Sequence, residues 1–548
     1  MKCSRTRVKK GLLAAGVSAL AMTLPATAQP PELEITKYRI QSDDCGLRAC
    51  GMPEFQSQEE AIAFFAADRA DRLALTNATS DGGYKGWKRQ HKPFRSRGNQ
   101  VVFLDFDAGG LPTFPVCFTT GQLFGVFNDY VYTQEDRDAI QARIEADYAD
   151  FDYIFTQKEP VTGDFTTLSF GLNDAPLDCS AGSNIQLTPQ GFLSILFGQA
   201  ENIDFRNQSK NDNAFIDASL WAFLAQFNPN LLVSFSGLDP ADFSNDLGAV
   251  LTEAVTNQSA NTGSHELGHI QGLRHHDSIG APGDGLPTTG TPSPNDFIPV
   301  FNGPQNASET VLHVMASGAS VGLPLNGSVV TNRFFSERSA IKLTLADKDN
   351  RLREEDTYDK RGLRDKPVRL LPLRVPNTLI EGQNAGKRLN ADGIVVLGEI
   401  TETGEVDEYH FYGRAGKFIN IEMVSFSDSR FTNPVIGAMR LMKVNWDGSR
   451  TEIASNIQTF EPFDPLIFDQ ELPETAIYVV EVDAPNIVFF DQTGDGVPDP
   501  FPLDETGNGD LRFGDYELAF YSVETRLGRP PHRNFYRDRH PKRTASAD

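Results

Sequence analysis

The chain has 548 residues and a formal net charge of −24 at pH 7. Because phosphate binding depends on lysine and arginine side chains, this excess of acidic residues argues against nucleic acid as a partner. The length is more than a single hydrophobic core usually serves, so we expect two or three domains.

Residues 1–28 are typical of a signal peptide. Five basic residues precede the apolar run GLLAAGVSALAMTL, and an Ala-Thr-Ala sequence ends at Ala28. The run is shorter than the ~20 apolar residues that span a bilayer, which favours an export signal over a membrane anchor. No later segment is long and apolar enough to cross. We therefore expect a monomer that is secreted or periplasmic and has no membrane span.

Residues 29–97 are predicted to form an N-terminal pro-like segment. Once the signal is removed, four cysteines remain, and an even number in an exported chain indicates two disulfides. Three pairings are possible. The pairing that we expect is Cys45–Cys50 and Cys117–Cys179.

From residue 98 onward, strand and helix patterns alternate. Val101–Phe106 is a short apolar run before the turn-forming residues DAGG and indicates a buried strand. A helix is predicted to follow Thr133, its N-cap, because Ile140, Ile144 and Tyr148 recur every four residues on one face. The runs DYIFT, FTTLSFG and FLSILFG are predicted to be further strands.

The sequence changes character after residue 346. Residues 347–388 are charged, contain scattered prolines and lack periodicity, which predicts a linker or an extended connector. Residues 389–525 contain short strand-like runs separated by Gly, Asp and Asn. We expect a β-sandwich there, with Ile419, Ile421 and Met423 inside and the intervening Asn420 and Glu422 outside. The basic tail, 526–548, is predicted to be disordered.

Four of the nine histidines lie within the fifteen residues GSHELGHIQGLRHHD. If this stretch is helical, His265 and His269 lie one turn apart on one face, so both imidazoles can bind one metal ion. Glu266 is one step round the helix, where it can contact a bound water without being a ligand.

A third ligand requires the helix to end. His275 would point about 120° away from the other two on a continuous helix. Gly272 is placed to end the helix, since glycine adopts the left-handed conformation of helix C-termini. Three histidines leave a fourth position open for water, which is typical of catalytic zinc. His276 is the alternative third ligand, although the spacing favours His275.

These positions carry a family resemblance. The pattern H-E-x-x-H-x-x-G-x-x-H resembles that of metzincin zinc peptidases, and Met315 in LHVMASG is similar to the methionine of their tight turn below the metal. The resemblance covers roughly residues 98–346. It implies an α+β catalytic domain, with a mixed twisted sheet and an active-site helix, and zinc as cofactor. It also implies Glu266 as general base.

The same resemblance implies the surroundings of the site. Asp277 would support the zinc site, and the peptide or protein substrate would lie along an edge strand, for which Leu193–Gly198 is our candidate. Some metzincins have a zinc-binding tyrosine two residues after the methionine. That position here is Ser317, so no tyrosine ligand is expected.

Three further patterns lie outside the histidine motif. The stretch LRACGMPE loosely resembles the cysteine switch of matrix metalloproteinases, in which Cys50 would be a latency thiol, but a local disulfide is the simpler expectation.

Residues 389–525 resemble the bacterial pre-peptidase C-terminal domain, an all-β sandwich or jelly roll. Within it, two acidic repeats have the spacing of calcium ligands, or of plain polar turns. The calcium candidates are Asp491, Asp495, Asp499, Asp504, Asn508 and Asp510.

Together these features predict a secreted zinc metalloendopeptidase. The alternatives are an exported binding or adhesion protein with a vestigial zinc site, and a zinc hydrolase of non-peptide amides. An intact Glu266 beside three well-spaced histidines argues against a vestigial site.

Overall fold

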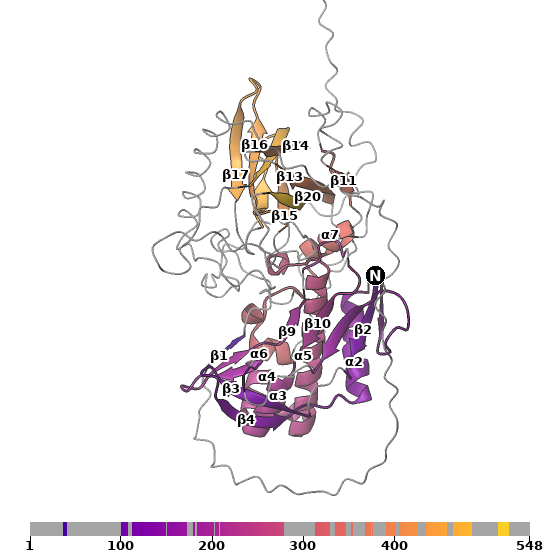
Figure 1. The fold of residues 1–548 in the computed structure, drawn as a ribbon, viewed down its shortest axis with the longest axis vertical. Coiled ribbons are helices and arrows are strands. Elements are labelled where there is room, and N and C mark those ends of the chain that lie inside the picture. The colour runs from indigo at the N-terminus through magenta and orange to yellow at the C-terminus, as the bar shows by residue number, and fades with distance from the viewer. Residues whose placement is uncertain are drawn as a thin grey trace, which may run out of the picture.

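The computed structural model describes two parts, one mixed α/β and one all-β (Figure 1). The described residues are 37–40, most of 100–278 and 313–346, then 352–354, most of 368–375 and 391–484, and 513–524. The predicted signal peptide and basic tail lie outside them, as do most of the pro-like segment and most of the linker. Among the described residues, no helix is long and apolar enough to cross a bilayer.

The helix that carries the histidine motif packs on one face of the first sheet of the α/β part. The order of this sheet is β5-β2-β6-β10-β9, and all neighbouring pairs are parallel except β10 and β9. The strand β2 (Gln100–Asp105) corresponds to the predicted buried run. The other members are β5 (Tyr153–Thr156), β6 (Thr166–Phe170), β10 (Asn213–Ile216) and β9 (Gly198–Ala200).

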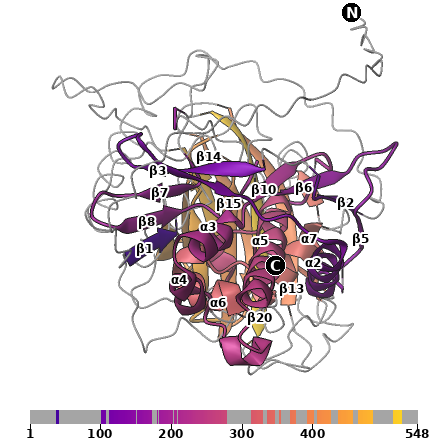
Figure 2. The ribbon, with the colours of Figure 1, turned by 90° about the horizontal axis from the view of Figure 1, so that it is seen from below.

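Two helices cross this sheet. The helix α2 (Gln134–Asp147) begins where predicted, because the Thr133 and Asp136 side chains form a reciprocal capping box. The longer α5 (Leu247–Ile270) contacts α2 and the strands β9 and β10. Figure 2 shows α5 in the middle, with α2 on one side and α3, α4 and α6 on the other. The bounds of those three are Ser219–Phe227, Pro229–Ser236 and Gly318–Ser328.

The second sheet corrects one prediction. Its order is β1-β8-β7-β3-β4, with bounds Lys37–Ile40, Phe192–Ile195, Ile185–Leu187, Thr113–Phe118 and Leu123–Asn128. The predicted substrate edge, Leu193–Gly198, is not one strand. Its first half belongs to β8, which lies between β1 and β7, and the chain then crosses to β9 in the first sheet. The strand β1 comes from the pro-like segment.

The all-β part consists of two sheets that face each other across one core. One has the order β11-β13-β20-β15-β18, with β12 paired to β13, and the other has the order β14-β19-β16-β17. The bounds of the first are β11 Leu352–Glu354, β12 Leu371–Pro372, β13 Ala391–Ile400, β15 Lys417–Val424, β18 Leu466–Glu471 and β20 Gly514–Glu524. Those of the second are β14 Val406–Gly413, β16 Ala438–Val444, β17 Arg450–Asn456 and β19 Ala476–Asp483.

The two parts share a buried junction. The helix α7 (Glu337–Ala346) packs its apolar residues against the sheet that contains β13, β15 and β20. Asn420 and Glu422 on β15 were predicted to be solvent-facing, but they are 0% and 1% exposed. The prediction was wrong because the outer face of this sheet meets cations of the α/β part: Arg338 donates to Asn420, and Lys342 donates to Glu422.

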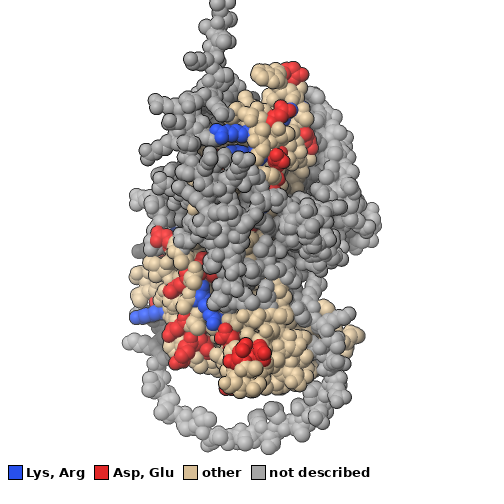
Figure 3. Space-filling view, turned by 180° about the vertical axis from the view of Figure 1, so that it is seen from behind, with Lys and Arg blue, Asp and Glu red and all other residues tan. Residues whose placement is uncertain are grey.

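On the face that Figure 3 shows, acidic side chains outnumber basic ones among the described residues, in keeping with the net charge. One pair of carboxyl groups, the partly buried Asp129 and the buried Asp217, has a consequence for stability. Asp129, after β4, has its pKa raised from 3.8 to about 7 by burial and by the nearby charge of Asp217. The partner is held in place, since Ser219 N and Asn184 Nδ2 donate to it at 2.7 Å.

Asp129→Asn is therefore expected to stabilise the protein at pH 8 and to leave its stability unchanged below pH 4. The unfolded chain releases the Asp129 proton near pH 4 and the folded chain near pH 7, so ionisation favours unfolding progressively between those values. With about 1.4 kcal/mol per pKa unit, the variant gains roughly 2–4 kcal/mol above pH 7. Urea unfolding at pH 4 and pH 8 measures this, and an equal difference at both pH values would contradict it.

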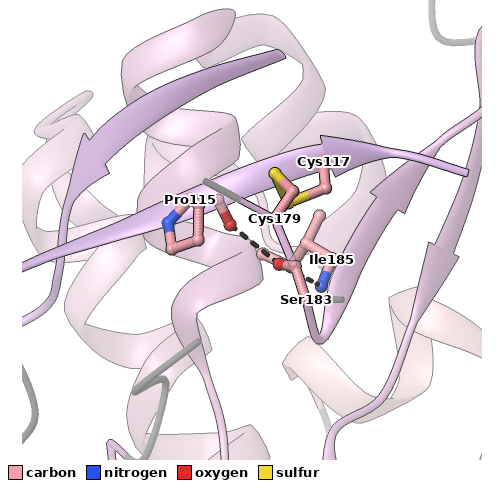
Figure 4. Close-up of a disulfide and its surroundings, with 5 residues drawn as sticks. All are labelled: Pro115, Cys117, Cys179, Ser183 and Ile185. Atoms are coloured by element: carbon pink, nitrogen blue, oxygen red, sulfur yellow. Dashed lines mark hydrogen bonds between the residues drawn. A yellow bond between two sulfur atoms is a disulfide. The ribbon is translucent and has the colours of Figure 1, made fainter. Parts of the chain in front are cut away.

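The predicted disulfide between Cys117 and Cys179 is present, whereas Cys45 and Cys50 lie outside the described residues. It joins β3 to the chain that leads into β7 (Figure 4). Beside it, Ser183 Oγ donates to Pro115 O at 2.8 Å and accepts from Ile185 N at 3.2 Å.

Replacing both cysteines with alanine is expected to lower the free energy of unfolding by about 4 kcal/mol, because the bridge closes a loop of 62 residues in the unfolded chain. Thermal unfolding with and without reductant measures the effect. Reductant should destabilise the wild type strongly and the variant only slightly, because the variant keeps no more than the predicted Cys45–Cys50 bridge, whose loop is short. A variant as stable as the oxidised wild type would contradict the expectation.

Candidate metal centre

The site is built on the C-terminal half of α5. The helix starts at the N-cap Asp246, whose Oδ1 accepts from Gly248 N at 2.8 Å. From Ala254 to Ile270 every residue is buried, so this half of the helix lies inside the α/β part. His265 and His269 project from it one turn apart, as the helical interpretation of the motif predicts.

The Nε2 atoms of three histidines converge. His265 Nε2 lies 3.0 Å from His269 Nε2 and 3.1 Å from His275 Nε2. Metal–nitrogen bonds of about 2.0–2.1 Å at tetrahedral angles separate ligand nitrogens by roughly 3.3 Å. The three nitrogens thus lie close to the spacing that one ion needs, and the residues fit a zinc ion.

Backbone carbonyls orient two of these rings. Val314 O lies 2.7 Å from His265 Nδ1, and Leu273 O lies 2.9 Å from His269 Nδ1. A carbonyl can only accept, so each Nδ1 carries the proton and each Nε2 keeps its lone pair for a metal. The rings are therefore held in the tautomer that binds zinc.

His275 reaches the other two because the helix ends as the motif predicts. Gly272 has φ +85°, Gly272 N donates to His269 O at 2.8 Å, and Leu273 N donates to Gly268 O at 2.9 Å. This pair of bonds is the Schellman arrangement, which reverses the chain after a helix. His275 then opens a short 3-10 turn, His275–Ser278.

Glu266 is fully buried and lies against the start of β9. A Cβ atom built on Gly198 would lie 2.7 Å from Glu266 Oε1 and 2.5 Å from Thr262 Cγ2. Only glycine at position 198 leaves room for this carboxylate. The carboxylate is thus placed between the histidine-bearing helix and the terminal strand of the first sheet.

Met315 packs against the turn of α5 between the first two histidines. It is 0% exposed, and a Cβ on Gly268 would lie 2.3 Å from its Sδ. The adjacent Val314 supplies the carbonyl that orients His265. The turn around Met315 therefore contributes to the site through the backbone as well as through packing.

His276 and Asp277 take other roles. His276 Nε2 faces Glu422 Oε1 at 3.5 Å, outside the triad, so His275 is the residue that completes it. Asp277 Oδ2 accepts from Arg274 N and from Lys342 Nζ, both at 2.8 Å. Asp277 thus stabilises the turn that carries His275.

A buried charge cluster surrounds that turn. Besides His276 and Asp277, it contains two cations of the α/β part and two carboxylates of the sandwich: Arg274, Lys342, Glu422 and Asp464. Burial raises the pKa of Glu422, but the charges of Lys342, His276 and Arg274 outweigh burial and hold that pKa well below its usual range. The carboxylate is therefore ionised in the folded protein. The group His276–Asp277–Glu422 has the spacing of metal ligands, but its two carboxylates are already paired with Lys342 and Arg274.

Sequence reasoning did not identify Arg274, Lys342 or Asp464. A basic residue in an amphipathic helix usually faces water, so nothing local marks Lys342 as buried. The only sequence signal was the position of Arg274 inside the histidine motif. The latency candidate Cys50 and all six calcium candidates lie outside the described residues: Asp491, Asp495, Asp499, Asp504, Asn508 and Asp510.

Comparisons with known proteins give only distant similarities to solved structures. No family model matches the sequence, and no curated protein matches it. Among solved structures, the pre-peptidase C-terminal domain of a collagenase from Bacillus anthracis is 12% identical, with a TM-score of 0.15; the match covers 23% of this chain and 88% of that one. A protein from Sulfurospirillum deleyianum is 8% identical, also with a TM-score of 0.15, over 24% of this chain and 98% of that one. The chain is a mixed α/β protein with a β-rich C-terminal part.

Proposed function

We propose that the protein is an exported zinc-dependent metalloendopeptidase of metzincin type. The observation that carries the proposal is the convergence of three Nε2 atoms beside a buried glutamate, with that of His265 lying 3.0 Å from that of His269 and 3.1 Å from that of His275. Two of the rings have their Nδ1 atoms directed at carbonyl oxygens. Three neutral histidines leave one tetrahedral position open, which is the arrangement of catalytic rather than structural zinc.

The residues have distinct roles in this proposal. His265, His269 and His275 would hold zinc, which supplies Lewis-acid activation of a water and of the peptide carbonyl. Glu266 accepts the proton of the attacking water and returns it to the leaving amine. Proton transfer by one carboxylate in both steps restores Glu266 to its ionised state at the end of each turnover.

The sheet suggests how a substrate would be held. The strand β9 is terminal and antiparallel in its sheet, and Gly198 at its start adjoins the Glu266 carboxylate. A substrate that pairs with this strand in extended form would bring a peptide bond near the general base. Gly198–Ala200 therefore replaces Leu193–Gly198 as our candidate for the substrate-binding edge.

Chelation tests the proposal. We expect the purified chain to cleave casein and a mixed peptide library, to lose this activity in chelator, and to regain it with one equivalent of zinc. Cleavage that survives complete removal of the metal would contradict the proposal. Tight zinc binding without cleavage of any peptide would favour the binding-protein alternative.

A further inference from the structure

The segment that carries His275 is connected on both sides to the C-terminal sandwich. The Arg274 side chain, 2% exposed, donates to Asp464 Oδ2 at 2.8 Å and places its Nε 3.4 Å from Glu422 Oε1. On the other side of His275, His276 Nε2 lies 3.5 Å from the same Glu422 oxygen. The residues before and after the third histidine are therefore both paired with the sandwich.

The carboxylates are themselves held in position. Asp464 accepts from Ser425 N at 3.1 and 3.2 Å within the sandwich. Glu422 lies on β15 and accepts from Lys342 of α7 at 3.1 Å. Lys342 also binds Asp277, whose carboxylate accepts from Arg274 N. These bonds connect Asp464 and Glu422 of the sandwich with Arg274 and Asp277, which lie on either side of His275.

The junction is too well packed for two independently moving modules. Phe205, Ile341 and Leu345 of the α/β part share one buried apolar cluster with Val395, Val424 and other sandwich residues. Interfaces between domains of one chain are commonly smaller and more polar, and permit motion. Here the junction consists of an apolar cluster and fully buried ion pairs. The sandwich therefore holds the 274–278 turn in one position.

We infer that Glu422 and Asp464 are positioning residues for the third zinc ligand, so that the C-terminal sandwich is part of the metal centre. The inference rests on the proposed zinc site. Its consequence is that the sandwich controls zinc affinity, because both carboxylates determine the path of the chain at His275 through Arg274 and His276.

The test uses the full chain with the double substitution Glu422→Gln and Asp464→Asn. Zinc affinity is measured by competition with a chromophoric chelator, and the geometry by the visible spectrum of the cobalt-substituted protein. The matched control is Asp469→Asn, which removes an equally buried sandwich carboxylate from Arg338, a residue of α7 outside the 274–278 turn. Circular dichroism and thermal unfolding of the apo forms establish that each variant folds.

We expect zinc to bind the double variant about 10–100-fold more weakly and its cobalt spectrum to change, as for the loss of groups that orient metal ligands. The control should stay within about twofold of wild type. If the double variant does not fold, Arg274→Lys gives the same readout, because it keeps the charge but cannot reach both carboxylates. Wild-type affinity and spectrum in the folded variants would overturn the inference.

These results are distinguishable from failure of the proposed function. A wild type that binds zinc but cleaves no peptide would contradict the peptidase proposal and would leave the affinity comparison intact. A wild type that cleaves peptides, with variants of unchanged zinc affinity, would overturn only the positioning role. A wild type that binds no zinc would overturn both.

Discussion

Replacing Glu266 by glutamine is expected to lower the rate of peptide hydrolysis by about 10²- to 10⁴-fold, the usual contribution of a general base. Glutamine is nearly isosteric, so it fits the space beside Gly198 but cannot accept the proton of the attacking water. The three histidines are unchanged, and zinc should remain bound with one equivalent per chain. The measurement is the initial rate of cleavage of a fluorogenic peptide, with zinc content determined on the same sample.

The matched control is Glu253→Gln on the same helix. Glu253 is partly exposed and pairs with Arg143 at 3.4 Å, so its loss should cost less than about 1 kcal/mol and should not change the rate. Equal rates for wild type and the Glu266 variant would exclude this residue as the base. Loss of zinc from the Glu266 variant would mean that the substitution disturbs the site itself.

Gly272→Ala should destabilise the protein by about 2–5 kcal/mol and weaken zinc binding. Alanine at φ +85° costs roughly 1–2 kcal/mol, because the left-handed region crowds the Cβ atom. The new Cβ would also lie 2.3 Å from Phe205 Cα, a backbone atom that can move only with its loop, and overpacking of this kind costs about 1–3 kcal/mol more. Denaturant unfolding of the apo protein and zinc competition measure the two effects.

Gly121→Ala separates the two causes. Gly121 has φ +79°, but a Cβ there meets nothing within 4 Å, so only the backbone cost of about 1–2 kcal/mol should appear. The difference between the two variants then measures the contact with Phe205. Equal destabilisation by both substitutions would show that the turn tolerates the extra atom, and would remove the reason for expecting weaker zinc binding.

Local sequence patterns were sufficient for the elements that carry the candidate ligands. The Thr133 cap and the four-residue spacing of Ile140 and Ile144 predicted α2, and the helical interpretation of the histidine motif placed His265 and His269 together. The expected left-handed conformation of Gly272 explained how the helix ends and how His275 reaches the other two histidines. Each of these features depends on interactions within a few turns of chain, and those interactions leave a direct mark on residue type and spacing.

Tertiary pairings were not predictable in the same way. FLSILFG has the composition of one strand, but it is divided between β8 and β9 because its halves pair with strands of two different sheets. Alternation along β15 indicated that Glu422 faces water, but Lys342, which lies 80 positions earlier in the sequence, contacts it there. Alternation reports which residues lie on each face of a strand, and it does not report what packs against the polar face.

The most direct test of the metal centre is the zinc content of the purified full-length chain, wild type beside His275→Ala and His410→Ala. His410 is a partly exposed histidine of the sandwich that pairs with Glu408, so it controls for loss of an imidazole. The account predicts one zinc per chain in the wild type and in His410→Ala, and strongly reduced zinc in His275→Ala. A wild type without zinc, or a zinc content unchanged by His275→Ala, would contradict it.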